Sequence, residues 1–230
     1  MVPLYAHRLG RAYGPDNSAS ALAGALAHDV DGLETDVCLS ADGDLVLLHD
    51  PWLPLSTGLE GFAHQRSARE LRRAGILTLE DLLAATPRAV ALQLDVKAHT
   101  DPALAARTVD ALASRLRSER RRHVEVLSFT VAACERAAML RLPARLVIWA
   151  DYAPAALARW GRRSGVRGVC IEHFLLSVPL VTALRAAGLS VTTGTVNDVA
   201  RLERVLRFAP DAVTTDAPHL LRAGVSSLAA

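Results

Sequence analysis

Two carboxylates stand at alternate positions, Glu34 and Asp36, in the apolar run 32–39. Because successive side chains of a strand point to opposite faces, both carboxylates would point to the same side of a sheet. Two charges on the inward side of a strand are costly without a partner, and a divalent cation is a natural one. The Asp-Gly step in the turn 41–44 predicts a hairpin that brings His49 back towards the carboxylates. This combination is typical of an active site.

Two other apolar runs also end in groups that could do chemistry. His7 and Arg8 follow the first run, and Asp95 and Lys97 close another. Together with Asp95, the two carboxylates above form a set of hard oxygen ligands, which suits Mg²⁺ or Ca²⁺ better than a soft metal. The alternative is that the carboxylates only form internal ion pairs with Arg8 and Lys97.

The elements that must position these groups alternate between strand and helix along the whole chain. The expected strands are 2–6, 31–37, 90–96, 124–127, 146–149, 168–171, 190–193 and 212–214. The expected helices are 18–28, 67–73, 78–85, 102–120, 131–140, 153–163, 179–187, 199–208 and 217–223. Eight such units predict a single α/β domain over 1–230, a TIM (β/α)₈ barrel, whose active site lies at the carboxyl ends of the strands. A hairpin-containing insertion is expected after the second strand, at about 38–77. An open doubly wound sheet is the rival, but no glycine-rich phosphate fingerprint follows the first strand.

Short motifs occur in a fixed order along the chain. They are His7-Arg8, Pro15-Asp16-Asn17-Ser18, Glu34-Thr35-Asp36-Val37, Asp42-Gly43, His49-Asp50, the run 77–83, Asp95-Val96-Lys97, Ser128-Phe129, Thr195-Val196-Asn197 and Thr214-Thr215-Asp216-Ala217-Pro218. The ordered set resembles the glycerophosphodiester phosphodiesterases, which have a phospholipase C-like TIM barrel, and it covers almost the whole chain. The resemblance implies metal-dependent hydrolysis of glycerophosphodiesters to glycerol 3-phosphate and an alcohol.

The resemblance also assigns roles to the residues. It implies catalysis by His7 and His49, phosphate binding by Arg8 and Lys97, and a metal on Glu34, Asp36 and Asp95. Cleavage of a phosphodiester takes a proton from the attacking oxygen and gives one to the leaving alkoxide, and two imidazoles can do both near neutral pH. Which histidine is the acid stays open. The attacking oxygen could be that of water, or a hydroxyl of the substrate through a cyclic phosphate.

Three positions depart from the family pattern. Asp95 stands where the family usually has Glu, and Leu9 separates Arg8 from Gly10, where the family normally has Gly directly after Arg. Gly194 stands where the family commonly has Trp, and a missing indole is expected to widen the mouth of the site.

Glu172, Trp149 and Gly194 follow or end later strands and are candidate substrate contacts. A wide mouth would favour a second activity, lysophospholipase D on single-chain phospholipids. A non-catalytic barrel that binds a phosphate-bearing ligand is the alternative from another class. The two acid-base histidines argue against it, because binding alone does not need them.

Composition restricts the remaining choices. The net charge of +2 in 230 residues is too balanced for a nucleic-acid binder, and 120–122, a run of three arginines, is interpreted as a solvated helix end. The three cysteines lack metal-type spacing and are expected to be buried free thiols. No apolar run approaches the roughly 20 residues of a membrane span, and no signal peptide is expected. We therefore expect a cytoplasmic protein that acts on small molecules, of undetermined oligomeric state.

Overall fold

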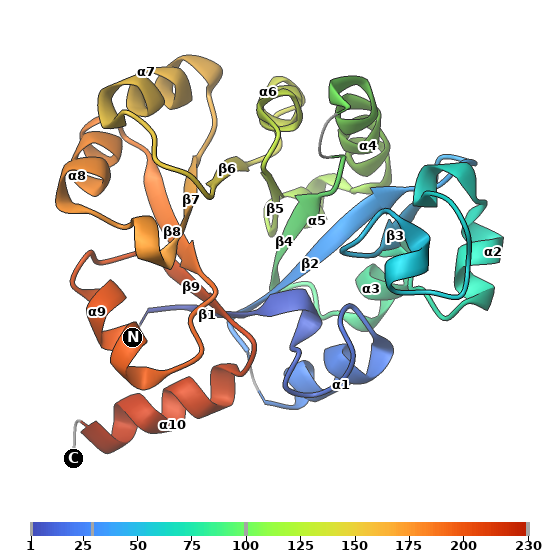
Figure 1. Cartoon of the computed structure of the whole chain (residues 1–230), viewed down its shortest axis with the longest axis horizontal. Helices are drawn as coiled ribbons and strands as arrows, with labels where there is room; N and C mark the ends of the chain where they lie inside the picture. The colour runs from blue at the N-terminus through green and yellow to red at the C-terminus, as the bar shows by residue number, and fades with distance from the viewer. Residues whose placement is uncertain (1, 29, 99–100, 229–230) are drawn as a thin grey trace.

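The computed structural model of the chain describes residues 2–28, 30–98 and 101–228. Within this part, eight parallel strands close into a barrel with helices around it (Figure 1). The barrel strands are β1 (Leu4–Ala6), β2 (Gly32–Leu39), β4 (Ala91–Val96), β5 (Val124–Ser128), β6 (Ala144–Ile148), β7 (Gly168–Glu172), β8 (Ser190–Gly194) and β9 (Ala212–Thr215). Because β1 pairs with both β2 and β9, the sheet has no free edge among these strands. The TIM barrel expected from the alternation is confirmed.

The helices lie close to their expected positions. They are α1 (Ala19–Ala27), α2 (Ala68–Arg73), α3 (Leu79–Ala85), α4 (Pro102–Arg115), α5 (Ser118–Arg121), α6 (Val131–Met139), α7 (Pro154–Ser164), α8 (Val178–Ala186), α9 (Val199–Leu206) and α10 (Pro218–Leu228). Ser18 caps α1 by accepting a hydrogen bond from the backbone N–H of Ala21 at 3.2 Å. Thr78 caps α3 in a reciprocal capping box with Asp81.

One expected helix is divided, and its end is not solvated as the sequence suggested. The range 102–120 splits into α4 and α5, because Leu116 leaves the helical conformation and buries its side chain. Arg120 is only 9% exposed, and its Nη1 donates to backbone carbonyls of the segment 87–90. The run of three arginines therefore includes one buried guanidinium that anchors a neighbouring loop.

The expected insertion follows β2. The strand β3 (Leu45–Leu47) runs back antiparallel to β2 with Val37 opposite Leu47, and this pairing returns the chain towards the barrel mouth just before His49. The insertion has an apolar cluster of its own, formed by Cys38, Val46, Leu48, Leu53, Ala63, Ala68, Leu71 and Ile76. This cluster holds β3 and α2 against the end of the barrel.

The interior of the barrel is layered, because alternate residues of each strand point inward. At the amino ends of the strands, Arg145 Nε donates to Glu125 Oε2 at 2.7 Å, and Gln93 Nε2 donates to the same oxygen at 2.9 Å. These hydrogen bonds offset part of the lost hydration, while Glu125 Oε1 and Arg145 Nη1 are buried without a hydrogen-bond partner among the described residues. One layer higher on the same strands stand Asp95 and Leu127, which belong to the carboxyl end.

Two smaller expectations concern the cysteines and the membrane. Cys38, Cys134 and Cys170 are buried free thiols, as expected. Among the helices of the described residues, none combines the length and the apolar character that crossing a bilayer would need.

Candidate active site

A cavity of about 230 Å³ opens at the carboxyl ends of the barrel strands. Its wall contains all seven residues to which the sequence assigned a catalytic, phosphate-binding or metal-binding role, namely His7, Arg8, Glu34, Asp36, His49, Asp95 and Lys97. The opposite side of the wall is apolar and comes from later strands, with Leu127, Phe129, Val147 and Cys170. The cavity thus has one charged half and one apolar half.

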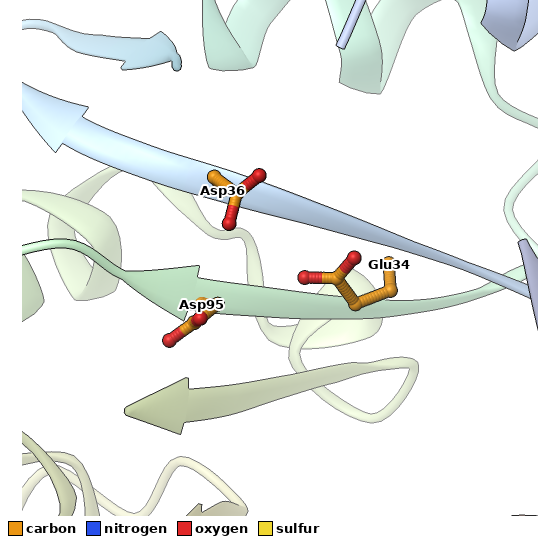
Figure 2. Close-up of side chains that lie close together, drawn as sticks. All are labelled: Glu34, Asp36 and Asp95. Atoms are coloured by element: carbon orange, nitrogen blue, oxygen red, sulfur yellow. The ribbon is translucent and has the colours of Figure 1, made fainter. Parts of the chain in front are cut away.

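Three carboxylates converge on one point in the charged half (Figure 2). Glu34 and Asp36 both come from β2, and Asp95 comes from β4, directly opposite Asp36 in the strand pairing. One oxygen of each lies within 4.8 Å of the others. The three residues are 2–5% exposed. Their alternation on β2 and the parallel register of β4 together produce the cluster.

The charge of this cluster is not fully balanced by the protein. Burial, together with the charge of Asp36, raises the pKa of Glu34 to about 7. Asp95 Oδ1 is buried and accepts no hydrogen bond from the residues that the structure describes. Asp95 therefore offers a buried oxygen without a partner, and Glu34 a carboxylate whose charged form is disfavoured. A hard divalent cation would bind such oxygens and balance their charge. The residues present therefore fit such a metal.

The ion pairs expected as the alternative are present for Asp36. Lys97 Nζ lies 3.0 Å from Asp36 Oδ1 and 2.6 Å from Asp95 Oδ2. Burial alone would lower the pKa of Lys97, but the charges of Asp95 and Asp36 outweigh it and raise that pKa well above its usual value. Arg8 Nη1 donates to Asp16 Oδ2 at 2.6 Å, and its Nε lies 3.7 Å from Asp36 Oδ2. Glu34 differs, since its Oε2 accepts from the backbone N–H of Arg8 at 2.9 Å.

Each catalytic histidine candidate is held through Nδ1 by a carboxylate. His7 Nδ1 lies 2.7 Å from Asp216 Oδ1, and His49 Nδ1 lies 2.8 Å from Asp50 Oδ1. A carboxylate at Nδ1 fixes the tautomer and the ring orientation, so that Nε2 of each ring is left for a substrate.

The two imidazoles have opposite electrostatic environments. Burial lowers the pKa of His7, but the hydrogen bond to Asp216 and the charge of Glu34 outweigh it, so the net pKa is raised. For His49 burial is again the largest effect, and the nearby charge of Asp36 does not offset it, so the pKa is lowered. Compared with an ordinary histidine, His7 therefore keeps its proton to higher pH and His49 loses its proton at lower pH.

Three polar residues that were not singled out for the site hold its members in place. Asn17 Nδ2 donates to Asp36 Oδ2 at 2.9 Å and keeps a left-handed backbone with φ of 55°. Asn197 Nδ2 donates to Asp216 Oδ2 at 2.6 Å, on the far side of that carboxylate from His7. Asn17, Asn197 and Asp216 all lie within the quoted sequence motifs, in the loops that follow β1, β8 and β9, and this position was the signal for their roles.

The three candidate substrate contacts fare differently. Glu172 and Gly194 line the cavity. Trp149 does not, because it sits beyond the end of β6 with 64% of its surface exposed. Gly194 does not leave an open apolar gap either: a Cβ at this position would lie 2.8 Å from the Cβ of Thr214. A side chain of a β9 residue already occupies the space that the missing indole was expected to open.

The first loop makes a tight turn around Leu9, the residue between Arg8 and Gly10. Arg8 and Leu9 both adopt positive φ, 48° and 65°, and the Leu9 side chain is fully buried in the core. This tight turn places the backbone N–H of Arg8 on Glu34. Leu9 therefore serves as an apolar anchor beneath the charged half of the cavity.

Comparison with known proteins agrees with the geometry of the site. Residues 7–220 match the model of the glycerophosphoryl diester phosphodiesterase family. The "Probable glycerophosphodiester phosphodiesterase 2" of Mycobacterium tuberculosis is 29% identical over 227 residues, which cover 90% of this chain and 84% of that protein.

Solved structures share the fold. That of an Oleispira antarctica phosphodiesterase in complex with the product sn-glycerol-3-phosphate has a TM-score of 0.83 at 24% identity, covering 97% of this chain and 96% of the other. That of the Thermotoga maritima glycerophosphodiester phosphodiesterase has a TM-score of 0.81 at 20% identity, covering 97% and 98%. Since the family model spans nearly the whole barrel, the chain belongs to the glycerophosphoryl diester phosphodiesterase family and is a phosphoric diester hydrolase.

Proposed function

We propose that this enzyme hydrolyses glycerophosphodiesters to glycerol 3-phosphate and an alcohol, with His7 and His49 as its acid-base pair and a divalent cation on Glu34, Asp36 and Asp95. The observation that carries the proposal is the pair of carboxylate-held imidazoles in one cavity with the three-carboxylate cluster. Mg²⁺ and Ca²⁺ both match the all-oxygen donor set.

Arg8 and Lys97 are proposed to hold the phosphate of the substrate. Arg8 lines the cavity, and a guanidinium is a planar donor group that suits phosphate oxygens. Lys97 stands between two carboxylates and adds a positive charge to the same wall. A bound divalent cation would supply further stabilisation of the negative charge that develops on the phosphoryl oxygens.

His49 is proposed as the general base and His7 as the general acid, since their pKa values are shifted in opposite directions. Nε2 of His49 accepts the proton of the attacking oxygen as that oxygen forms its bond to phosphorus. The bond from phosphorus to the leaving oxygen breaks, and Nε2 of His7 gives its proton to the alkoxide. The scheme holds for attack by water and for attack by a neighbouring hydroxyl of the substrate.

Glu172 is proposed to accept a hydrogen bond from a hydroxyl of the glycerol moiety. It lines the cavity at the end of β7 and is half-buried, and burial raises its pKa. The apolar half of the wall offers contact to the carbon atoms of the same moiety. Lysophospholipase D activity is the alternative, and none of the relatives named above is described as a lysophospholipase D.

A product analysis tests the proposal. The purified protein is incubated with a panel of glycerophosphodiesters and lysophospholipids, with Mg²⁺, with Ca²⁺ or after exhaustive chelation, and both products are identified. We expect glycerol 3-phosphate and free alcohol, only when a metal is supplied. Release of glycerol and a phosphorylated alcohol, or full activity after chelation, would contradict it. Faster release of choline from lysophospholipids than from glycerophosphocholine would favour the lysophospholipase alternative.

A further inference from the structure

The exposed aromatic side chains of this protein gather at the mouth of the barrel. The chain has only three tryptophans, three tyrosines and four phenylalanines. Six of these are exposed, and all six lie on the insertion after β2 or on loops that follow the carboxyl ends of later strands. They are Trp52, Phe62, Phe129, Trp149, Tyr152 and Phe174. In a protein so poor in aromatic residues, exposure confined to one end of the barrel indicates an interaction surface.

Half of these side chains are accounted for by their surroundings. Trp52 and Phe62 pack on each other within the insertion, with ring centroids 4.8 Å apart. Phe129 lines the catalytic cavity. The three that lie outside both the insertion and the cavity wall are Trp149, Tyr152 and Phe174, which are 64%, 43% and 67% exposed.

The loops that carry these three side chains follow neighbouring strands. β5, β6 and β7 pair in that order, so the segments after them form one arc of the mouth (Figure 1). The same strands supply the apolar half of the cavity wall, and Phe129 belongs to both the wall and the arc. The apolar surface therefore continues from the cavity onto the outside. We call this outer part the apolar rim, and it consists of Phe129, Val131, Trp149, Tyr152, Phe174 and Val178.

The apolar rim carries almost no charge. Its segments 129–131, 149–153 and 173–178 contain neither lysine nor arginine, and Asp151 is their only carboxylate. Attraction to an anionic membrane requires clustered basic residues, which these segments lack. Tryptophan and tyrosine rings settle at the headgroup level of a bilayer, because one part of each ring is apolar and another is polar. The rim therefore matches a zwitterionic lipid surface.

The place of the rim also distinguishes a lipid surface from a protein partner. A second copy of the chain, or another protein, that buried the rim would cover the entrance of the catalytic cavity as well. A lipid surface has a reason to face this entrance. A glycerophosphodiester is a phospholipid without its acyl chains, so hydrolysis of acyl esters at a lipid surface is the class of reaction that supplies it. That supply depends on the function proposed above, whereas docking of the rim can be measured without any substrate.

We propose that the apolar rim docks this enzyme on the surface of a zwitterionic phospholipid membrane. Trp149 and Phe174, the most exposed aromatic side chains of the rim, insert among the headgroups. They lie at the ends of the adjacent strands β6 and β7, so both reach the same surface. The catalytic cavity then opens towards the lipid.

The first test is sedimentation of the full-length protein with sucrose-loaded phosphatidylcholine vesicles. The wild type should sediment with the vesicles, and added salt should not weaken binding, because salt screens only charges. Absence of co-sedimentation overturns the proposal. Binding that requires an anionic lipid and disappears at high salt overturns it as well. Turnover of a soluble glycerophosphodiester, measured on the same preparation, separates a failure of docking from a failure of the proposed function.

The second test uses substitutions. Trp149→Ala and Phe174→Ala should each weaken binding to the vesicles about tenfold, because each removes a large apolar side chain that docking buries. Met139→Ala is the matched control, at a side chain that is 73% exposed where α6 ends, at the opposite end of the barrel, and should bind as the wild type does. All three variants should keep wild-type turnover of the soluble diester, since none of these side chains lines the cavity. Equal binding by Trp149→Ala and Met139→Ala overturns the proposal.

Sedimentation velocity without vesicles tests the other occupant of the rim. The wild type and Trp149→Ala should show the same oligomeric state. A dimer of the wild type that Trp149→Ala abolishes would assign the rim to a second copy of the chain and overturn the lipid assignment.

Discussion

The two imidazoles of the active site differ through the residues that hold them. Asp216 comes from the end of β9, on the far side of the barrel seam, whereas Asp50 is the next residue in the chain after His49. The His7–Asp216 pair is the more enclosed, with side chains 18% and 23% exposed, against 32% and 40% for His49 and Asp50. Because a less hydrated ion pair is screened less, Asp216 should influence its histidine more strongly.

The pH profile of kcat/KM should report these carboxylates separately. If His7 must be protonated, activity falls as pH rises through its pKa, and Asp216→Asn should lower that pKa and move the alkaline limb to lower pH. If His49 must be neutral, activity rises with pH through its pKa, and Asp50→Asn should move only the acidic limb, also to lower pH. If Asp216→Asn moves the acidic limb instead, His7 is the general base and His49 is the general acid.

Removing either imidazole should be costly for turnover. His7→Ala and His49→Ala should each lower kcat by roughly 10²-fold or more, the usual scale for a positioned proton-transfer group. His123→Ala is the matched control, since His123 is exposed at the other end of the barrel and should keep wild-type turnover. Circular dichroism checks that all three variants fold. Near wild-type activity in either active-site variant would show that its histidine is structural.

At the scale of elements, the insertion after β2 determines where His49 lies. The strand β3 is only three residues long, and a strand this short needs packing from outside the ladder to keep its place. The apolar cluster of the insertion provides that packing, with Leu71 of α2 fully buried at its centre. A change that destabilises this cluster should therefore also displace His49.

Truncation of Leu71 tests this link. Leu71→Ala should destabilise the protein by about 2–5 kcal/mol, because it removes buried methyl groups and leaves a cavity. Leu55→Ala is the matched control in the same insertion, at a side chain that is 71% exposed, and should change stability little. Urea denaturation measures both. We also expect Leu71→Ala to lower kcat/KM at a temperature where the variant is still folded, and an unchanged kcat/KM would mean that the barrel alone positions His49.

The whole barrel divides into an end that is balanced in charge and an end that is not. At the amino ends of the strands, Glu125 is matched by Arg145. At the carboxyl ends, no lysine or arginine in the described part of the chain forms an ion pair with Glu34, and its pKa is raised to about 7. The stability of the metal-free enzyme should therefore depend on pH through this carboxylate.

The sign of that dependence follows from proton linkage. A carboxyl group whose pKa is higher in the folded state than in the unfolded state binds its proton more tightly when folded, so stability falls as pH rises from about 5 to about 8. Asp36 has a lowered pKa, so its effect on the pH dependence of stability lies at lower pH. Differential scanning fluorimetry of chelated protein should show a melting temperature that falls over this range, and added Mg²⁺ or Ca²⁺ should raise it more at pH 8 than at pH 5.5.

Glu34→Gln isolates the carboxylate from the histidines, which titrate in the same window. The variant should lose most of the fall in melting temperature and most of the stabilisation by metal. An equal response to metal at both pH values in the wild type would exclude competition between proton and cation at Glu34.

Much of this molecule could be predicted from local sequence patterns. The alternation of strand and helix predicted the barrel, because each unit can bury its apolar face only against its neighbours. The spacing of Glu34 and Asp36 predicted two carboxylates on one face, because the period of a strand is two residues. The hairpin after β2 was also predicted, since it depends on residues close together in the chain.

Contacts between distant segments were decided only by the tertiary structure. Asp216 meets His7 across 209 residues of chain because β9 closes the barrel against β1, and no local pattern contains that register. Thr214 fills the space beside Gly194 for the same reason. Trp149 is exposed and is not part of the cavity wall, although its position after β6 had suggested that it would be. Arg120 is buried because Leu116 ends its helix and turns the chain under a neighbouring loop. Sequence periodicity determined which residues face inward at each strand end, and the closure of the barrel determined which of them touch.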